Sequence, residues 1–75
     1  MERHLRQASA DGDARAVAAL LADKRLGLDL NHANIVGATP LYIASREGHA
    51  EVVSMLLAKQ GVDVNQTTND GFTPL

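Results

Sequence analysis

Residues 37–65, GATPLYIASREGHAEVVSMLLAKQGVDVN, decide the fold of this chain because they open with the signals that start and stop a short helix. Thr39 can cap a helix through its hydroxyl, and Pro40 then takes the first helical position, where its missing N–H costs nothing. The helix is expected to run to about Arg46. Gly48 can adopt the left-handed conformation that commonly ends a helix. This half of the stretch therefore predicts a capped helix followed by a tight turn.

A second helix is predicted directly after that turn. Its apolar residues recur at the spacing of a single buried stripe, and they are Val52, Val53, Leu56 and Leu57. Gly61 is expected to end this helix, and residues 62–65 are expected to lead away in extended form. A short helix, a turn, a second helix and an extended return together make one helical hairpin.

The hairpin recurs along the chain. The opening GATPL at 37–41 returns as GFTPL at 71–75, 34 residues later, and Asn65 repeats Asn31 after the same interval. A fixed period of this length is typical of stacked-repeat proteins. The G-x-T-P-L opening, the A-S-R-E-G-H helix end, the E-V-V-x-x-L-L second helix and the G-x-D-V-N exit resemble the ankyrin repeat. The resemblance implies an all-α solenoid of paired antiparallel helices with projecting, β-hairpin-like turns, incomplete at the C-terminus.

Residues 1–31 align with the central unit as a looser copy of it. ASADGD at 8–13 matches ASREGH at 44–49 with an offset of 36 residues, and Asp13 is expected to cap a helix over about 14–26. A charged segment replaces the T-P-L opening, as suits a terminal repeat whose outer face meets water. We therefore divide the chain into a capping-type repeat (1–31), a full repeat (32–65) and the start of a third repeat (66–75).

The third repeat is expected to be truncated, because the sequence stops at Leu75, just inside its first helix. About three repeats are usually needed for independent stability. We therefore expect a fragment of a longer array, in which further repeats cover the apolar helix flank that follows Leu57. Without such a cover, the same flank is expected to promote self-association, since uncovered apolar helix faces tend to find partners.

Composition argues against several classes of function. The 75 residues contain no cysteine, so neither disulfides nor a thiolate metal site is available. A formal net charge of −2 and an isoelectric point near 5.8 provide no electrostatic footprint for nucleic acid or an anionic membrane. No apolar run reaches membrane-spanning length, and the charged N-terminus is unlike a signal peptide. We expect an intracellular, cytoplasmic chain that binds neither nucleic acid nor membrane.

No residues in the sequence point to catalysis, a metal or a cofactor. The histidines His4, His32 and His49 share no metal-binding spacing, and the DGD triplet at 11–13 lacks the remaining ligands of a calcium loop. There is no phosphate-binding glycine loop and no nucleophile with a base beside it. We therefore expect no enzymatic activity and no cofactor. The resemblance instead assigns His49 to ordering the turn after Gly48 through hydrogen bonds.

Three features leave alternatives open. Tyr42 stands where ankyrin repeats usually carry histidine, and it could pack against the adjacent repeat or lie along a binding groove. Ile35 and Val36 lie near a turn tip, where they could fold against the neighbouring turn or form an apolar contact. Asn31 and Asn65 occupy the exit position, where asparagine is expected to bond the turn backbone and where some ankyrin repeats are hydroxylated.

The resemblance also implies a function, which is recognition of another protein by the concave face of the turns and first helices. Positions that commonly vary with the partner correspond to Ile35, Val36, Ala38, Arg46, Glu47, Asn69, Asp70 and Phe72. Phe72 is the only phenylalanine and has no obvious core role, so we expect it to contribute most. Two alternatives remain. The chain could be a non-catalytic piece of a larger enzyme or channel, or a structural segment that only joins neighbouring repeats.

Overall fold

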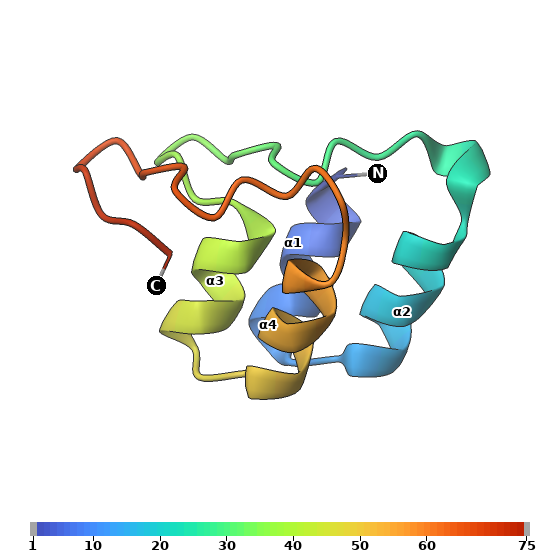
Figure 1. The fold of residues 1–75 in the computed structure, drawn as a ribbon. Helices are drawn as coiled ribbons and strands as arrows, with labels where there is room; N and C mark the ends of the chain where they lie inside the picture. The colour runs from blue at the N-terminus through green and yellow to red at the C-terminus, as the bar shows by residue number, and fades with distance from the viewer. Residues whose placement is uncertain (1, 75) are drawn as a thin grey trace.

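The computed structural model describes residues 2–74, and within them the secondary structure is helical, with no β-strand. The α-helices are α1 (Glu2–Asp11), α2 (Ala14–Ala22), α3 (Pro40–Arg46) and α4 (Ala50–Leu57). Helices α1 and α2 form one hairpin, and α3 and α4 form the next, with α1 against α3 and α2 against α4 (Figure 1). The extended connections run along one end of the helices, and the tight helix–helix turns lie at the other end. The predicted all-α repeat fold is therefore confirmed.

Side-chain caps start two of these helices at the predicted residues. Thr39 Oγ1 accepts a hydrogen bond from the backbone N–H of Tyr42 at 3.2 Å, and Pro40 follows as the first helical residue. Asp13 Oδ1 accepts from the N–H of Ala16 at 3.1 Å at the start of α2. Each oxygen satisfies one of the N–H groups that a helix start leaves unpaired. Local capping chemistry therefore sets where α2 and α3 begin.

The C-terminal ends of α2 and α4 come earlier than predicted. Helix α2 ends at Ala22 rather than near residue 26, because Asp23 takes an extended conformation and its carboxylate binds the backbone N–H and guanidinium of Arg25. Such local side-chain bonds compete with helix continuation. A short 3₁₀ turn, Lys24–Leu26, replaces the predicted last turn. Helix α4 ends at Leu57, before the polar residues that precede Gly61.

The core lies between the four helices. Its fully buried apolar side chains are Leu5, Val17, Leu41, Ala44, Val52 and Leu56, each at most 1% exposed. Two members of the predicted buried stripe of α4 behave differently, because Leu57 is 42% exposed and Val53 is only partly buried. Both line a hollow with Ser45 of α3, whereas Met55 lines a hollow with residues of α2. The stripe is therefore split between the core and an open flank.

His49 joins the second hairpin to the first. Its Nε2 lies 3.0 Å from the carbonyl oxygen of Ala10, within hydrogen-bonding distance. The imidazole also lies on Gly12, so closely that a Cβ atom at Gly12 would overlap the ring. His49 thus has a structural role, but its side-chain hydrogen bond goes to the preceding repeat and not, as the sequence predicts, to its own turn.

Asn31 forms a second link between the repeats. Its Nδ2 donates to the carbonyl of Gly61 at 2.8 Å, and its Oδ1 accepts from the N–H of Asp63 at 2.7 Å. The side chain of Gln66 adds a bond to the Asn31 carbonyl at 3.0 Å. As expected for an exit asparagine, Asn31 bonds turn backbone, here the backbone of the next repeat.

Glu2 ties the start of α1 to the first connection and makes stability depend on pH. Its carboxylate accepts a hydrogen bond from the N–H of Asp29 at 3.1 Å, which lowers the pKa of Glu2 below its ordinary value. A carboxyl whose pKa is lowered by folding stabilises the fold at any pH above its unfolded pKa, about 4.3. It loses that contribution as the pH falls through its folded pKa.

Between neutral and acid pH, we therefore expect the urea midpoint of Glu2→Gln to fall by less than the midpoint of the wild-type chain. Glu51→Gln, which alters an exposed carboxyl on α4, is the matched control, and an equal acid loss in wild type and Glu2→Gln would contradict the assignment.

Candidate protein-binding groove

A hollow of about 420 Å³ lies between the two projecting turns and α3. Residues of both turns and of one side of α3 line it. They are Asn34, Val36, Ala38, Tyr42, Ile43, Arg46, Glu47, Thr68, Asp70 and Phe72. We call this hollow the groove. Its lining combines apolar side chains with charged and hydrogen-bonding groups, as many protein-binding surfaces do.

Each turn is closed by a polar side chain four residues before the turn ends. Asn34 Oδ1 accepts from the N–H groups of Val36 and Ala38, both at 3.0 Å. In the second turn, Thr68 Oγ1 accepts from the N–H of Phe72 at 3.2 Å, and the Thr68 N–H donates to the Phe72 carbonyl at 2.9 Å. These bonds fix the backbone at Val36 and Phe72, whose surfaces are 56% and 61% exposed. The closed turns therefore present apolar side chains to solvent.

The two turns are also bonded to each other. The N–H of Asn69 donates to the Val36 carbonyl at 3.0 Å, and the Asn69 side-chain amide donates to the Ile35 carbonyl at 2.9 Å. Gly37 allows this close approach, because a Cβ atom there would meet Asn69 at 2.6 Å. The groove is consequently preformed, which lowers the entropy lost when a partner binds.

Six of the eight residues predicted to contact a partner line the groove, namely Val36, Ala38, Arg46, Glu47, Asp70 and Phe72. Ala38 is only 3% exposed, so it belongs to the floor. Ile35 lies outside the groove and is 96% exposed, so its side chain does not fold against the neighbouring turn. Asn69 bonds turn to turn and does not line the groove.

Sequence reasoning missed three residues of the groove, Asn34, Ile43 and Thr68, and left Tyr42 undecided. The signals that could have found them are simple. Tyr42 precedes Arg46 by four residues on α3, as Ile43 precedes Glu47, and residues four apart share one side of a helix. Asn34 and Thr68 are 34 residues apart and close equivalent turns. Tyr42 is half-buried and lines the groove.

The charged residues of the groove form no internal ion pairs in the part of the chain that the structure describes. The one salt bridge in that part of the chain joins Arg25 Nε to Asp23 Oδ1 at 3.0 Å, outside the groove. Arg46, Glu47 and Asp70 are exposed and remain available to charged groups of a partner. Exposed charges at a binding surface mainly influence the association rate and the choice of partner.

Metal and membrane sites were sought across residues 2–74. No group of three or more histidine, aspartate or glutamate side chains is placed to hold a metal ion there. Within the same residues, every helix is too short or too polar to cross a membrane. The chemistry that the groove offers is therefore apolar contact together with charged and hydrogen-bonding groups.

Comparison with known proteins agrees with the all-α repeat fold. A family model described as ankyrin repeats, three copies, matches residues 5–75. The chain belongs to the ankyrin-repeat family. It is 42% identical over 53 residues, 71% of this chain, to cortactin-binding protein 2 of Ornithorhynchus anatinus. It is 35% identical over 71 residues, 95% of this chain, to cortactin-binding protein 2 of Rattus norvegicus.

A further ankyrin-repeat relative is protein phosphatase 1 regulatory subunit 12A of Homo sapiens, 38% identical over 60 residues and 73% of this chain. The three matches cover 3%, 4% and 6% of the relatives' own lengths. The likeness is therefore to a small part of much longer proteins.

Proposed function

We propose that this ankyrin-repeat chain binds a partner protein through the groove and has no catalytic activity of its own. The observation that carries the proposal is the convergence of both turns and α3 on one preformed hollow, lined by Val36, Tyr42 and Phe72. Exposed apolar side chains that are held in place by backbone bonds lose little entropy on binding. The division into repeats at 1–31, 32–65 and 66–75 is part of the same proposal.

Phe72 is the proposed anchor of the interface. It is 61% exposed, lies across the groove from α3, and has its own N–H and carbonyl fixed by Thr68. Aromatic residues on rigid backbone are frequent hot spots, because a few buried anchors carry most of the binding energy. Arg46, Glu47 and Asp70 would then select the partner by charge.

The relatives support the class of activity. One is named for binding cortactin and another as a regulatory subunit of a phosphatase. Both names describe proteins that act through other proteins. We take from them only the class of activity, which is protein recognition.

Selection from a phage-displayed peptide library tests the proposal, because the library itself supplies the ligands. We expect peptides selected on the wild-type chain to bind Phe72→Ala at least about tenfold more weakly, because the anchor side chain is removed. Lys24→Ala, which changes an exposed residue far from the groove, should bind them unchanged. Selected peptides whose affinity is indifferent to Phe72→Ala and Val36→Ser alike would rule out the groove as the binding surface.

A further inference from the structure

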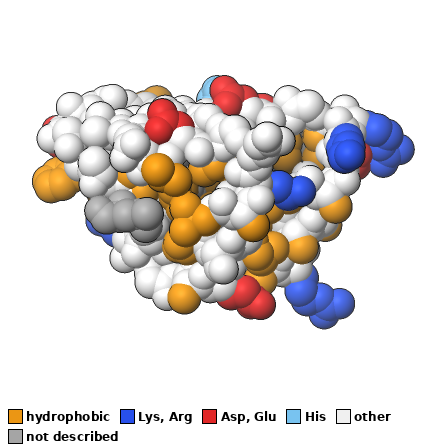
Figure 2. Space-filling view, viewed as in Figure 1, with side chains coloured by type: hydrophobic (Ala, Val, Ile, Leu, Met, Phe, Trp, Pro, Cys, Tyr) orange, Lys and Arg blue, Asp and Glu red, His pale blue; other side chains and the backbone are white. Residues whose placement is uncertain are grey.

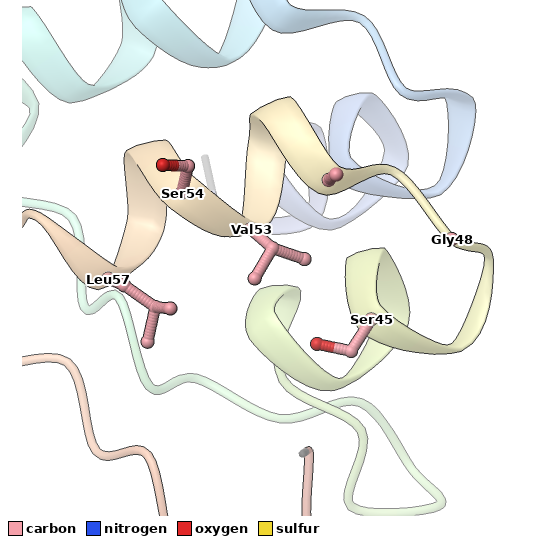
Figure 3. Close-up of a pocket in the computed structure, with 6 residues that line it drawn as sticks. Ser45, Gly48, Val53, Ser54 and Leu57 are labelled. Atoms are coloured by element: carbon pink, nitrogen blue, oxygen red, sulfur yellow. The ribbon is translucent and has the colours of Figure 1, made fainter.

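Two hollows lie beside α3, and they differ in chemistry. The first is the groove, and the second, of about 390 Å³, lies on the open side of α3 and α4 (Figure 3). We call this second surface the flank, and apolar side chains gather over α3 and α4 on it (Figure 2). Its lining within residues 2–74 carries no charge and consists of Ser45, Gly48, Ala50, Val53, Ser54 and Leu57. The groove carries three charged side chains, so it is the surface that can select a partner by charge.

The backbone of the groove is closed to the backbone of a partner. Residues of the two projecting turns line the groove, and in all of them except Asp70 both the N–H and the carbonyl form hydrogen bonds within the chain. They are Asn34, Val36, Ala38, Thr68 and Phe72. The backbone of Asp70 forms no hydrogen bond within residues 2–74. One open residue cannot support a β-ladder, in which successive bonds join two strands.

The turns themselves use these backbone groups. In the first turn, the N–H of Asn34 donates to the Ala38 carbonyl at 3.0 Å, and the N–H of Gly37 donates to the Asn34 carbonyl at 2.9 Å. In the second turn, the N–H of Gly71 donates to the Thr68 carbonyl at 2.9 Å. A partner strand would find almost no free N–H group along the groove.

This closure favours one kind of partner segment over another. An extended segment laid in the groove would turn part of its own backbone toward the turns. Its N–H and carbonyl groups would lose water there without gaining backbone partners, and an unpaired buried polar group is costly. A helix avoids this cost, because its backbone groups bond one another. The groove therefore favours a helical segment that contacts it through side chains.

The side chains of the groove match a helix with one apolar face. On α3, Tyr42 and Ile43 lie near the helix start, beside the projecting turns, and Arg46 and Glu47 lie about one helical turn further along. The α3 side of the groove is thus apolar near the turns and charged at the far end of the helix. Asp70 adds a second carboxylate, on a turn. Two of the three charges are negative, so charge complementarity favours a basic partner.

We propose that the groove binds an amphipathic helix of a partner protein. Apolar side chains of that helix meet Val36, Tyr42 and Phe72, and lysine or arginine side chains beside them meet Glu47 and Asp70. The proposal rests on the proposed function, because it names the kind of partner segment that the same groove takes. It excludes the addition of a partner strand to the turns.

Peptides of about twenty residues, selected on the wild-type chain from a random phage-displayed library, serve as the probes. The peptides used are those that Phe72→Ala weakens, so that they occupy the groove. We expect the ¹³Cα chemical shifts of a labelled peptide to show helix in the bound state. A proline at the centre of that helix should weaken binding at least about tenfold, because it removes a helical hydrogen bond and clashes with the preceding turn. A proline at the first helical position is the matched control and should change the affinity by no more than about twofold.

The charges are tested on the chain itself. Glu47→Gln and Asp70→Asn should each lower the association rate of the same peptides at least about twofold at low salt, and the difference should shrink as salt is added. Glu51→Gln removes an exposed carboxylate outside the groove and should leave the rate unchanged.

The outcomes separate this proposal from the function on which it rests. Peptides that need Phe72 but bind in an extended form, or that tolerate the central proline, would overturn the helix and leave the groove as the binding surface. Equal association rates for wild type, Glu47→Gln and Asp70→Asn would contradict the basic character of the partner. If neither Phe72→Ala nor Val36→Ser weakens any selected peptide, the proposed function fails and this proposal fails with it.

Discussion

Replacing Leu56 by alanine is expected to lower the free energy of unfolding by about 2–5 kcal/mol, because the side chain is completely buried and its removal leaves a cavity among the four helices. Natural domains are stable by roughly 0.05–0.15 kcal/mol per residue, which is roughly 4–11 kcal/mol for 75 residues. The substitution therefore removes a large part of the stability of so small a core. Urea unfolding followed by circular dichroism at 222 nm, a standard helix signal, measures the loss.

Leu57→Ala is the matched control, since the same change is made at the next residue of α4. Leu57 is 42% exposed on the flank, so we expect a loss of about 1 kcal/mol or less. The contrast follows from the orientation of α4 and not from helix propensity, because both substitutions introduce alanine into the same helix. Equal losses at the two positions would mean that the flank is covered in solution, by self-association or by a different packing of α4.

Leu56 and Leu57 also mark a limit of sequence reasoning. Both fit the apolar spacing of a buried helix stripe, and the sequence predicts both as buried. Which of them enters the core depends on the elements that lie beside α4, and the open flank leaves Leu57 exposed. Periodicity identifies the apolar side of a helix but not how much of that side is covered.

Helix starts were predictable because capping is local. Thr39 and Asp13 each bond an N–H three residues later, a relation that the sequence alone contains. The ends of α2 and α4 were less predictable. In α2, the carboxylate of Asp23 binds Arg25 and competes with the last turn, although the alanine-rich sequence favours a longer helix.

The groove was predictable where the ankyrin resemblance places residues on turns, as for Val36 and Phe72. It was not predictable where a residue's role depends on hydrogen bonds between turns. Asn69 was expected to contact a partner, yet its amide bonds the Ile35 carbonyl 34 residues earlier. A polar side chain on a turn offers the same sequence signal whether it binds its own backbone or a ligand.

Gly12→Ala is expected to destabilise the chain by about 2–4 kcal/mol, because two separate effects add. Gly12 has a φ of 69°, a left-handed conformation that costs an alanine roughly 1–2 kcal/mol. The added Cβ would also overlap the His49 imidazole and displace it from the Ala10 carbonyl. The lost hydrogen bond and the disturbed packing account for the remainder. Thermal and urea unfolding of the variant measure the total.

Gly48→Ala separates the two effects. Gly48 is the equivalent residue of the second hairpin, with a φ of 76° and open space where its Cβ would lie, so this variant has the backbone strain alone. We expect it to lose about 1–2 kcal/mol. In a His49→Ala background, the cost of Gly12→Ala should fall to that of Gly48→Ala, because the ring that the Cβ meets is gone. An unchanged cost in that background would show that the imidazole is not what makes Gly12 necessary.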